Sequence, residues 1–248
     1  MTDLLLSVIC CRLSVFCMRI GFLTNCLRHR NLPEIIEWAG ANGFSALELA
    51  CWPREGNAVD PSLDVVNFSQ QNADELYALA RQHNITFTCL TYCPNTLAHN
   101  PAERDANVKH IYRVIDAAQL LGVQNVSTFV GRDETKTQKQ NFDEMANVFA
   151  PMLDYAGARN VRIAIENCPM PGWQFEGLAG NVAYAPVIWD EMFARLPHAN
   201  FGLNLDPSHL VWLGVNYYDI VPQYASRIFH THAKDTEIYA DKRPYYSI

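Results

Sequence analysis

The sequence contains no apolar run long enough to cross a membrane and few charged residues of any kind. Charged side chains make up 18% of the 248 residues, against roughly 25% in average domains, and no uninterrupted stretch of about 20 apolar residues occurs. Positive charge is scarce, because 19 Lys and Arg face 26 Asp and Glu for a net charge of −7. The apolar share of 49% excludes a disordered, collagen-like or coiled-coil chain. The composition predicts a folded protein without a membrane span, and its acidic balance argues against a nucleic-acid partner.

The cysteines lack the spacing of a disulfide framework or of a compact zinc site. Eight are present, at positions 10, 11, 17, 26, 51, 89, 93 and 168, and no two form a CxxC pair. Disulfides occur mainly in oxidising compartments and in small secreted domains, so we expect reduced, buried thiols and a cytoplasmic location. Cys51, Cys93 and Cys168 each follow an expected strand, which leaves a thiolate zinc site as an alternative for these three.

The first seventeen residues differ from the rest of the chain. They are apolar without a regular period, and Asp3 stands where a signal peptide carries positive charge. Met18 then opens a segment that is typical of a first strand. We therefore expect residues 1–17 to be an N-terminal extension outside the fold and residues 18–248 to form one domain. A secretory signal is the alternative for residues 1–17.

From Met18 onward, short apolar runs alternate with longer amphipathic segments. Helical patterns begin near Pro33 and cover 72–83, 102–121 and 142–159, and the expected strands are 19–23, 46–50, 86–91, 125–130, 162–166, 201–206 and 227–232. Such alternation predicts a parallel sheet with helical crossovers. No GxGxxG motif follows the first strand, which disfavours a dinucleotide-binding sheet. We predict an α/β fold, a (β/α)8 TIM barrel with about seven of its eight βα units present.

Three strands end in residues that a plain core would not contain. Glu166 ends the expected fifth strand, Asp206 the sixth and His232 the seventh. The active sites of α/β barrels lie at these carboxyl ends, and a buried charge needs a partner or a metal. Two carboxylates and an imidazole suit a divalent cation. Asp206 has a simpler alternative role, which is to start the turn at Pro-Ser-His. His230 shares a face with His232 and is interpreted as a core or supporting histidine.

Six segments make the chain resemble a known family. They are 43–53, 90–95, 128–133, 165–169, 202–209 and 230–235, of which the last two are specific in combination. Over residues 18–240 the chain resembles the sugar phosphate isomerase/epimerase family of xylose isomerase-like TIM barrels. The resemblance implies that Glu166, Asp206 and His232 bind one divalent metal, which is Mn²⁺, Mg²⁺, Co²⁺ or Zn²⁺. It also implies that His209 contacts the substrate or supports the site.

The activity that the resemblance implies is isomerisation or epimerisation of a small sugar or sugar phosphate. A proton next to a carbonyl is removed through an enediolate stabilised by the metal, with Glu166 as both ligand and base and His209 as a second catalytic residue. The residues expected to contact the substrate are Glu48, Trp52, Tyr92, Arg132, His209 and Lys234.

Three of these substrate contacts have structural alternatives. Glu48 has the alternative of a buried pair with an arginine, Arg132 that of an ion pair with Asp133, and Lys234 that of an ion pair with Asp235. Trp52 and Tyr92 are expected to form an apolar wall against a sugar ring.

The sequence departs from the family pattern at its end. In such barrels a glutamate at the end of the eighth strand completes the metal site, and residues 238–248 contain no glutamate. We therefore expect a barrel that stops before its eighth strand, with weak or no turnover, since loss of an acid/base group costs about 10²–10⁴-fold.

Three other functions stay open from the sequence. One is dehydration of an inosose-type substrate, which uses the same chemistry. Another is a shortened chain that binds metal without turnover. The least favoured is a phosphodiesterase like the apurinic/apyrimidinic endonucleases, which need a histidine-rich mouth and a basic surface; here Glu48 and Tyr92 stand at those strand ends. A homo-oligomer is also compatible with the composition.

Overall fold

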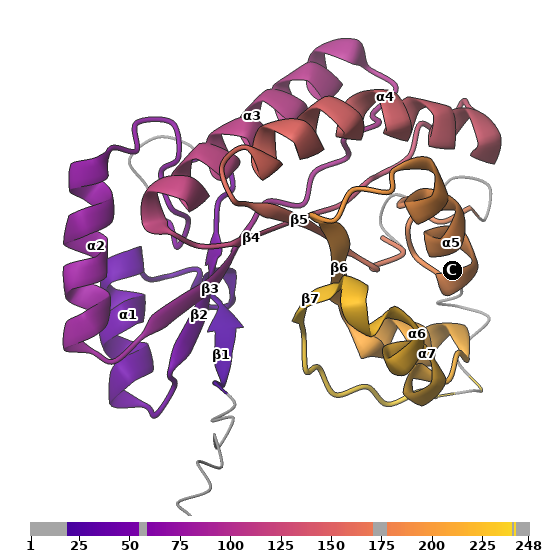
Figure 1. Cartoon of the computed structure of the whole chain (residues 1–248). Helices are drawn as coiled ribbons and strands as arrows, with labels where there is room; N and C mark the ends of the chain where they lie inside the picture. Colours follow the sequence, from indigo (N-terminus) through magenta and orange to yellow (C-terminus); the bar gives the residue numbers. More distant parts are fainter. Residues whose placement is uncertain (1–18, 55–58, 171–177, 240, 242–248) are drawn as a thin grey trace, which may run out of the picture.

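A computed structural model describes residues 19–54, 59–170, 178–239 and 241. The extension expected at residues 1–17 lies outside this part. The described residues form one sheet of seven parallel strands in the order β1-β2-β3-β4-β5-β6-β7, with β1 and β7 as the two edge strands (Figure 1). Each strand pairs with the next strand along the chain. The predicted α/β, TIM-barrel-like architecture is therefore confirmed, with seven parallel strands in the described residues.

The strands lie close to where the sequence places them. Their bounds are β1 (Gly21–Leu23), β2 (Ala46–Ala50), β3 (Thr86–Thr91), β4 (Asn125–Thr128), β5 (Arg162–Glu166), β6 (Phe201–Leu205) and β7 (Ile228–Thr231). Three expected strands match residue for residue, and the other four are shorter than expected. Asp206 and His232 thus stand one residue beyond their strands, in the loops where side chains of a barrel meet.

In the part of the chain that the structure describes, seven α-helices cover the outside of the sheet (Figure 1). They are α1 (Leu32–Ala41), α2 (Gln70–Gln82), α3 (Pro101–Leu121), α4 (Gln138–Gly157), α5 (Pro186–Arg195), α6 (Pro207–Leu213) and α7 (Tyr217–Tyr224). Short 3-10 helices, η1 (Thr24–Leu27) and η3 (Ala225–Arg227), flank the edge strands. Polar side chains fix where the longer helices begin: Asn31, Ser69 and Thr137 each accept a hydrogen bond from the backbone N–H three residues on.

The core lies between the sheet and these helices. All residues of β2 and β6 are buried, as expected for strands covered on both faces. Phe149 of α4 packs on Phe201 of β6 with ring centroids 5.8 Å apart. Trp189 of α5 is fully buried, and its indole N–H donates to the Ala183 carbonyl at 2.7 Å. None of the described helices is both long and apolar enough to serve as a membrane span.

Candidate metal and catalytic site

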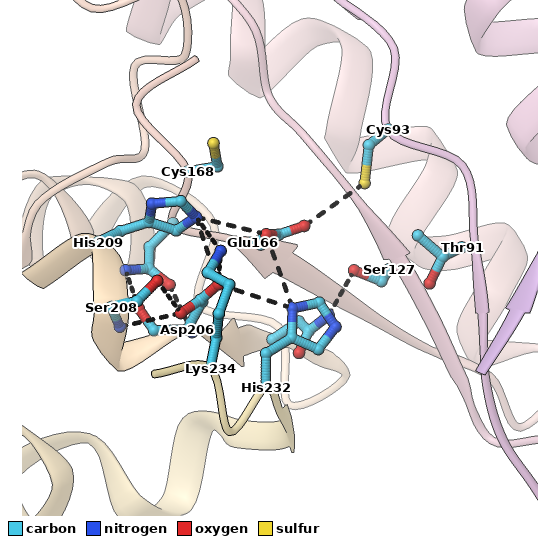
Figure 2. Close-up of polar contacts among 12 residues, drawn as sticks. Thr91, Cys93, Ser127, Glu166, Cys168, Asp206, Ser208, His209, His232 and Lys234 are labelled. Atoms are coloured by element: carbon cyan, nitrogen blue, oxygen red, sulfur yellow. Dashed lines mark hydrogen bonds and ion pairs between the residues drawn. The ribbon is translucent and has the colours of Figure 1, made fainter. Parts of the chain in front are cut away.

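The site is built at the carboxyl ends of the last three strands, because parallel strands bring these ends to one edge. Glu166 is the last residue of β5, Asp206 follows β6 and His232 follows β7. Figure 2 shows the three side chains turned toward one another, with His209 of α6 and Lys234 beside them. The structure thus brings together the three predicted metal ligands, and it adds two nitrogen-bearing side chains to the cluster.

Asp206 divides its two oxygens between the fold and the site. Its Oδ1 caps α6, accepting hydrogen bonds from Ser208 N at 2.9 Å and Ser208 Oγ at 2.6 Å. Its Oδ2 is buried, and no described donor meets it in hydrogen-bond geometry. Three nitrogens nevertheless face Oδ2 as ion pairs: Lys234 Nζ at 2.5 Å, His209 Nε2 at 3.3 Å and His232 Nδ1 at 4.0 Å. Oδ1 therefore has the turn-starting role named as the alternative for Asp206, and Oδ2 is left facing the other candidate ligands.

Glu166 also uses its oxygens differently. Oε1 lies 3.7 Å from both His209 Nε2 and His232 Nδ1, whereas Oε2 accepts a contact from Cys93 Sγ at 3.9 Å (Figure 2). Burial raises the pKa of Glu166, but the two histidines outweigh burial and bring its pKa down to about 2. Glu166 is thus anionic at neutral pH, with one oxygen in the cluster and the other outside it.

The two histidines carry the complementary charge. Burial lowers the pKa of His209, but contacts with Cys168 and Glu166 outweigh burial and raise the pKa to about 9. Burial likewise lowers the pKa of His232, and Glu166 and Glu48 outweigh it and raise the pKa to about 10. In the protein without metal, protons on both rings therefore balance the carboxylates. A cation that binds to these nitrogens has to displace those protons.

The donor set fits a divalent metal ion. Two ligand atoms at about 2.1 Å from one tetrahedral metal are about 3.4 Å apart. The distances from Asp206 Oδ2 to His209 Nε2 and His232 Nδ1 are 3.3 and 4.0 Å, and both nitrogens lie 3.7 Å from Glu166 Oε1. Small movements would place these atoms around one ion. His209, predicted as a catalytic and substrate-contacting residue, thus lies within reach of the same ion as the three predicted ligands.

His230 has a different environment from His232. Its Nδ1 lies 3.1 Å from Asn204 Oδ1, and its Nε2 lies 3.1 Å from Oγ1 of Thr88 in β3. One of its ring nitrogens also lies within 4.8 Å of a carboxylate oxygen of Glu48 and of a ring nitrogen of His232, in a second group compatible with a metal. Because both nitrogens of His230 already have partners, its environment agrees with the core or supporting role expected for it.

Glu48 was expected to face a substrate or to pair with an arginine, and the structure gives it another partner. The carboxylate is buried in β2, where its Oε1 accepts a hydrogen bond from the Thr91 hydroxyl. Its Oε2 lies 2.7 Å from His232 Nε2. The arginine alternative is therefore wrong for the described residues, since the ion-pair partner of Glu48 is a histidine from the other end of the chain.

Trp52 and Tyr92 lie together, as expected for an apolar wall. Their rings meet edge to face with centroids 6.1 Å apart, and both line a cavity of about 330 Å³ together with Cys93 and Glu103. The Tyr92 hydroxyl donates to Asn107 Oδ1 at 2.9 Å. Because Cys93 also contacts Glu166, the wall adjoins the candidate metal site.

Arg132 and Lys234, the two cationic residues predicted to contact the substrate, differ in burial and in hydrogen bonding. Arg132 is buried, and it donates from Nε to the Ala179 carbonyl at 2.6 Å and from Nη2 to Gln138 Oε1 at 2.7 Å. It therefore ties the loops after β4 and β5 together, and its neighbour Asp133 pairs with Lys136 instead. Lys234 is half exposed and contacts Asp206. The alternatives of an Arg132–Asp133 and a Lys234–Asp235 ion pair are absent from the described contacts.

Sequence reasoning missed the asparagines that hold the strand ends. Asn167 donates to the Asp206 carbonyl at 3.0 Å and accepts from Asp206 N at 2.8 Å. Asn181 donates to the carbonyls of Glu166 and Cys168 at 3.1 and 2.9 Å. Asn167 stands directly after Glu166, which was a usable signal, whereas nothing local marks Asn181. These amides fix the backbone from which the candidate ligands project.

A family model described as a xylose isomerase-like TIM barrel matches residues 36–243. The chain belongs to this family. A relative from Bacillus subtilis (strain 168), the uncharacterized protein YfiH, is 26% identical over 240 residues, covering 89% of this chain and 74% of YfiH.

Solved structures share the fold at low sequence identity. The probable 3-DHS dehydratase AsbF from Bacillus anthracis has a TM-score of 0.69 at 18% identity, covering 91% of this chain and 77% of AsbF. A D-tagatose 3-epimerase-like protein has a TM-score of 0.68 at 20% identity, with 91% and 79% covered. IolI with a bound zinc atom has a TM-score of 0.67 at 18% identity, with 90% and 74% covered.

Proposed function

We propose that this protein is a divalent-metal-dependent enzyme that isomerises or epimerises a small sugar or sugar phosphate. The observation that carries the proposal is the convergence of Glu166, Asp206, His209 and His232 at the strand ends, with ligand atoms 3.3–4.0 Å apart. Support comes from the solved structures of the same fold, because one is described as epimerase-like and another holds zinc.

The residues that would hold the metal are Glu166, Asp206 and His232, with His209 within reach. When bound, a divalent cation polarises a carbonyl and the neighbouring hydroxyl, which makes the adjacent C–H more acidic. Every other task falls to the side chains. We assign proton removal to Glu166, and the proposal is supported by its Oε2, which lies outside the cluster of nitrogens and faces Cys93.

Proton removal by Glu166 gives an enediolate, whose oxygens need donors. His209 and Lys234 are the donors at hand, since the Lys234 Nζ lies 3.4 Å from His209 Nε2 and the lysine side chain is 52% exposed. Isomerisation then returns the proton from Glu166 to the neighbouring carbon, and epimerisation requires an acid on the opposite face. Trp52 and Tyr92 would cover the apolar face of the ring.

A dehydratase acting on an inosose-type or related cyclic ketone is the second candidate. It is favoured by the fold similarity to a probable 3-DHS dehydratase, and it begins with the same proton removal. The two candidates diverge afterwards, because dehydration expels a hydroxyl that His209 would protonate. In either case we expect a small-molecule substrate, a cytoplasmic location and no nucleic-acid or membrane partner.

Deuterium exchange tests the shared step. The protein is loaded with Mn²⁺, Co²⁺, Zn²⁺ or Mg²⁺ in D₂O and given a panel of free ketoses, ketose phosphates and cyclic inososes. We expect deuterium next to the carbonyl of at least one substrate by mass spectrometry, with NMR after metal removal separating isomer, epimer and dehydrated product. Glu166→Gln should slow the exchange by about 10²–10⁴-fold. Stoichiometric metal binding without exchange in any substrate would contradict the proposed activity.

A further inference from the structure

Glu48 is a buried carboxylate, and each of its two oxygens has a partner. It lies in the middle of β2 with 4% of its surface exposed. The Thr91 hydroxyl of β3 donates to Oε1, and His232 Nε2 lies 2.7 Å from Oε2. Among the described residues, His232 is its one ion-pair partner. A carboxylate this deep in the sheet needs such a partner, since burial of an unpaired charge is very unfavourable.

The opposite edge of the His232 ring points into the candidate metal site. Its Nδ1 lies 3.7 Å from Glu166 Oε1 and 4.0 Å from Asp206 Oδ2 (Figure 2). One nitrogen of the ring therefore faces Glu48 and the other faces the two predicted carboxylate ligands. The ring joins a buried carboxylate on one side to the cluster on the other.

The hydrogen-bonding capacity of the neighbours decides which nitrogen of His232 carries hydrogen. A carboxylate oxygen accepts hydrogen bonds, so the 2.7 Å contact with Glu48 Oε2 places a hydrogen on Nε2. Asn204 Nδ2 lies 3.2 Å from the same nitrogen and donates one of its two hydrogens to Ser127 Oγ at 2.9 Å. The shorter contact of His232 Nε2, at 2.7 Å, is with the Glu48 carboxylate. With hydrogen held on Nε2, the lone pair that binds a metal is left on Nδ1.

We propose that Glu48 is a positioning residue that holds His232 with hydrogen on Nε2 and with Nδ1 directed at the metal. Thr91 assists by holding the other oxygen of Glu48. The proposal rests on the proposed function only in placing the metal at Glu166, Asp206 and His232. It changes the expected role of Glu48 from substrate contact to support of a ligand, an arrangement whose loss typically weakens metal binding 10–100-fold.

Two readouts that do not depend on turnover test this role. The affinity of the full-length protein for Zn²⁺ is measured by competition with a chelator, and histidine ¹⁵N NMR of the Zn²⁺-loaded protein reports which ring nitrogen binds the metal. The variants are Glu48→Gln, which keeps the shape and removes the charge, and Glu48→Ala, which removes both. Thr91→Val is a milder variant should Glu48→Ala fail to fold, and Glu37→Gln on the exposed face of α1 is the matched control.

We expect wild-type His232 to bind Zn²⁺ through Nδ1 and to carry hydrogen on Nε2. Glu48→Gln should weaken Zn²⁺ binding about 10-fold and Glu48→Ala about 100-fold, with Glu37→Gln unchanged. A merely structural role predicts that the isosteric Gln variant keeps wild-type affinity, and that result would overturn the proposal. So would binding of Zn²⁺ through Nε2 in the wild type.

These outcomes separate the role of Glu48 from the proposed activity. If Zn²⁺ binding depends on Glu48 as expected and no sugar is turned over, the positioning role stands and the proposed activity fails. If Zn²⁺ binds equally well to wild type and both Glu48 variants and sugars are turned over, the activity stands and the positioning role fails.

Discussion

Replacing Asp206 by Asn and by Ala separates the two tasks of this side chain. Oδ1 holds the start of α6 through two hydrogen bonds from Ser208, while Oδ2 faces the nitrogens of the site. Asparagine keeps an acceptor at Oδ1 and puts an amide donor in place of Oδ2, whereas alanine removes both. The stability of the fold and the binding of metal should therefore respond differently to the two substitutions.

The magnitudes follow from these contacts. Loss of a helix N-cap costs about 0.5–2 kcal/mol, and 1 kcal/mol shifts Tm by about 2–4 °C in a chain of this size. Metal-free Asp206→Ala should therefore melt about 1–8 °C below metal-free Asp206→Asn. In both variants the affinity for metal should fall by more than the roughly 10–100-fold that follows loss of a supporting group, because each variant lacks an anionic ligand.

Thermal unfolding of the metal-free variants and elemental analysis after loading with Zn²⁺ measure the two effects. Stoichiometric Zn²⁺ in Asp206→Asn would refute the assignment of Oδ2 as a ligand. Equal melting temperatures of the Asn and Ala variants would refute the capping role of Oδ1.

Three further predictions concern the scaffold around the site. Asn167→Ala removes two buried hydrogen bonds between the ends of β5 and β6. Because each bond contributes about 1 kcal/mol, the free energy of unfolding measured by urea denaturation should fall by about 2 kcal/mol. A fall below about 0.5 kcal/mol would contradict this. Phe149→Ala should cost about 3–5 kcal/mol by the same assay, because the ring is fully buried, and a smaller change would show that the core closes around the cavity. Asp133 is buried, which raises its pKa, but hydrogen bonds from Thr135 and Lys136 outweigh burial and lower the pKa. Its stabilising effect is therefore present above the unfolded-state pKa of about 4 and is lost as pH falls through the lower folded-state pKa, so the stability difference between wild type and Asp133→Asn should shrink in acid, and a difference independent of pH would contradict this.

Much of the fold could be predicted from the sequence because its signals are local. The β2 segment, Ala46–Ala50, is apolar except for Glu48 and is bounded by polar or loop residues. The spacing of such segments indicates the alternation of strands and helices. The expected strand at 125–130 extended too far, because β4 ends at Thr128 and Gly131 adopts a positive φ of 78°. The helices α5, α6 and α7 were not predicted, since they are short and lack a long amphipathic period.

The candidate site was predictable only in part, for a related reason. Parallel strands impose that Glu166, Asp206 and His232 lie at one edge, so their convergence follows from topology alone. The contact of Glu48 with His232 does not, since it joins residues 184 positions apart and depends on how the sheet curves. Arg132 was predicted to contact the substrate because it follows a strand. One of its hydrogen-bond acceptors is a carbonyl in a loop distant in sequence, and no local sequence pattern indicates that contact.

The central claim is that Glu166, Asp206 and His232 hold one divalent metal ion. Anomalous diffraction from crystals of the Zn²⁺-loaded protein tests it most directly, because it locates the ion without reference to activity. We expect one strong peak about 2.0–2.2 Å from an oxygen of each carboxylate and from Nδ1 of His232. A peak at other residues, or no peak at these strand ends in crystals soaked with Zn²⁺, would contradict it.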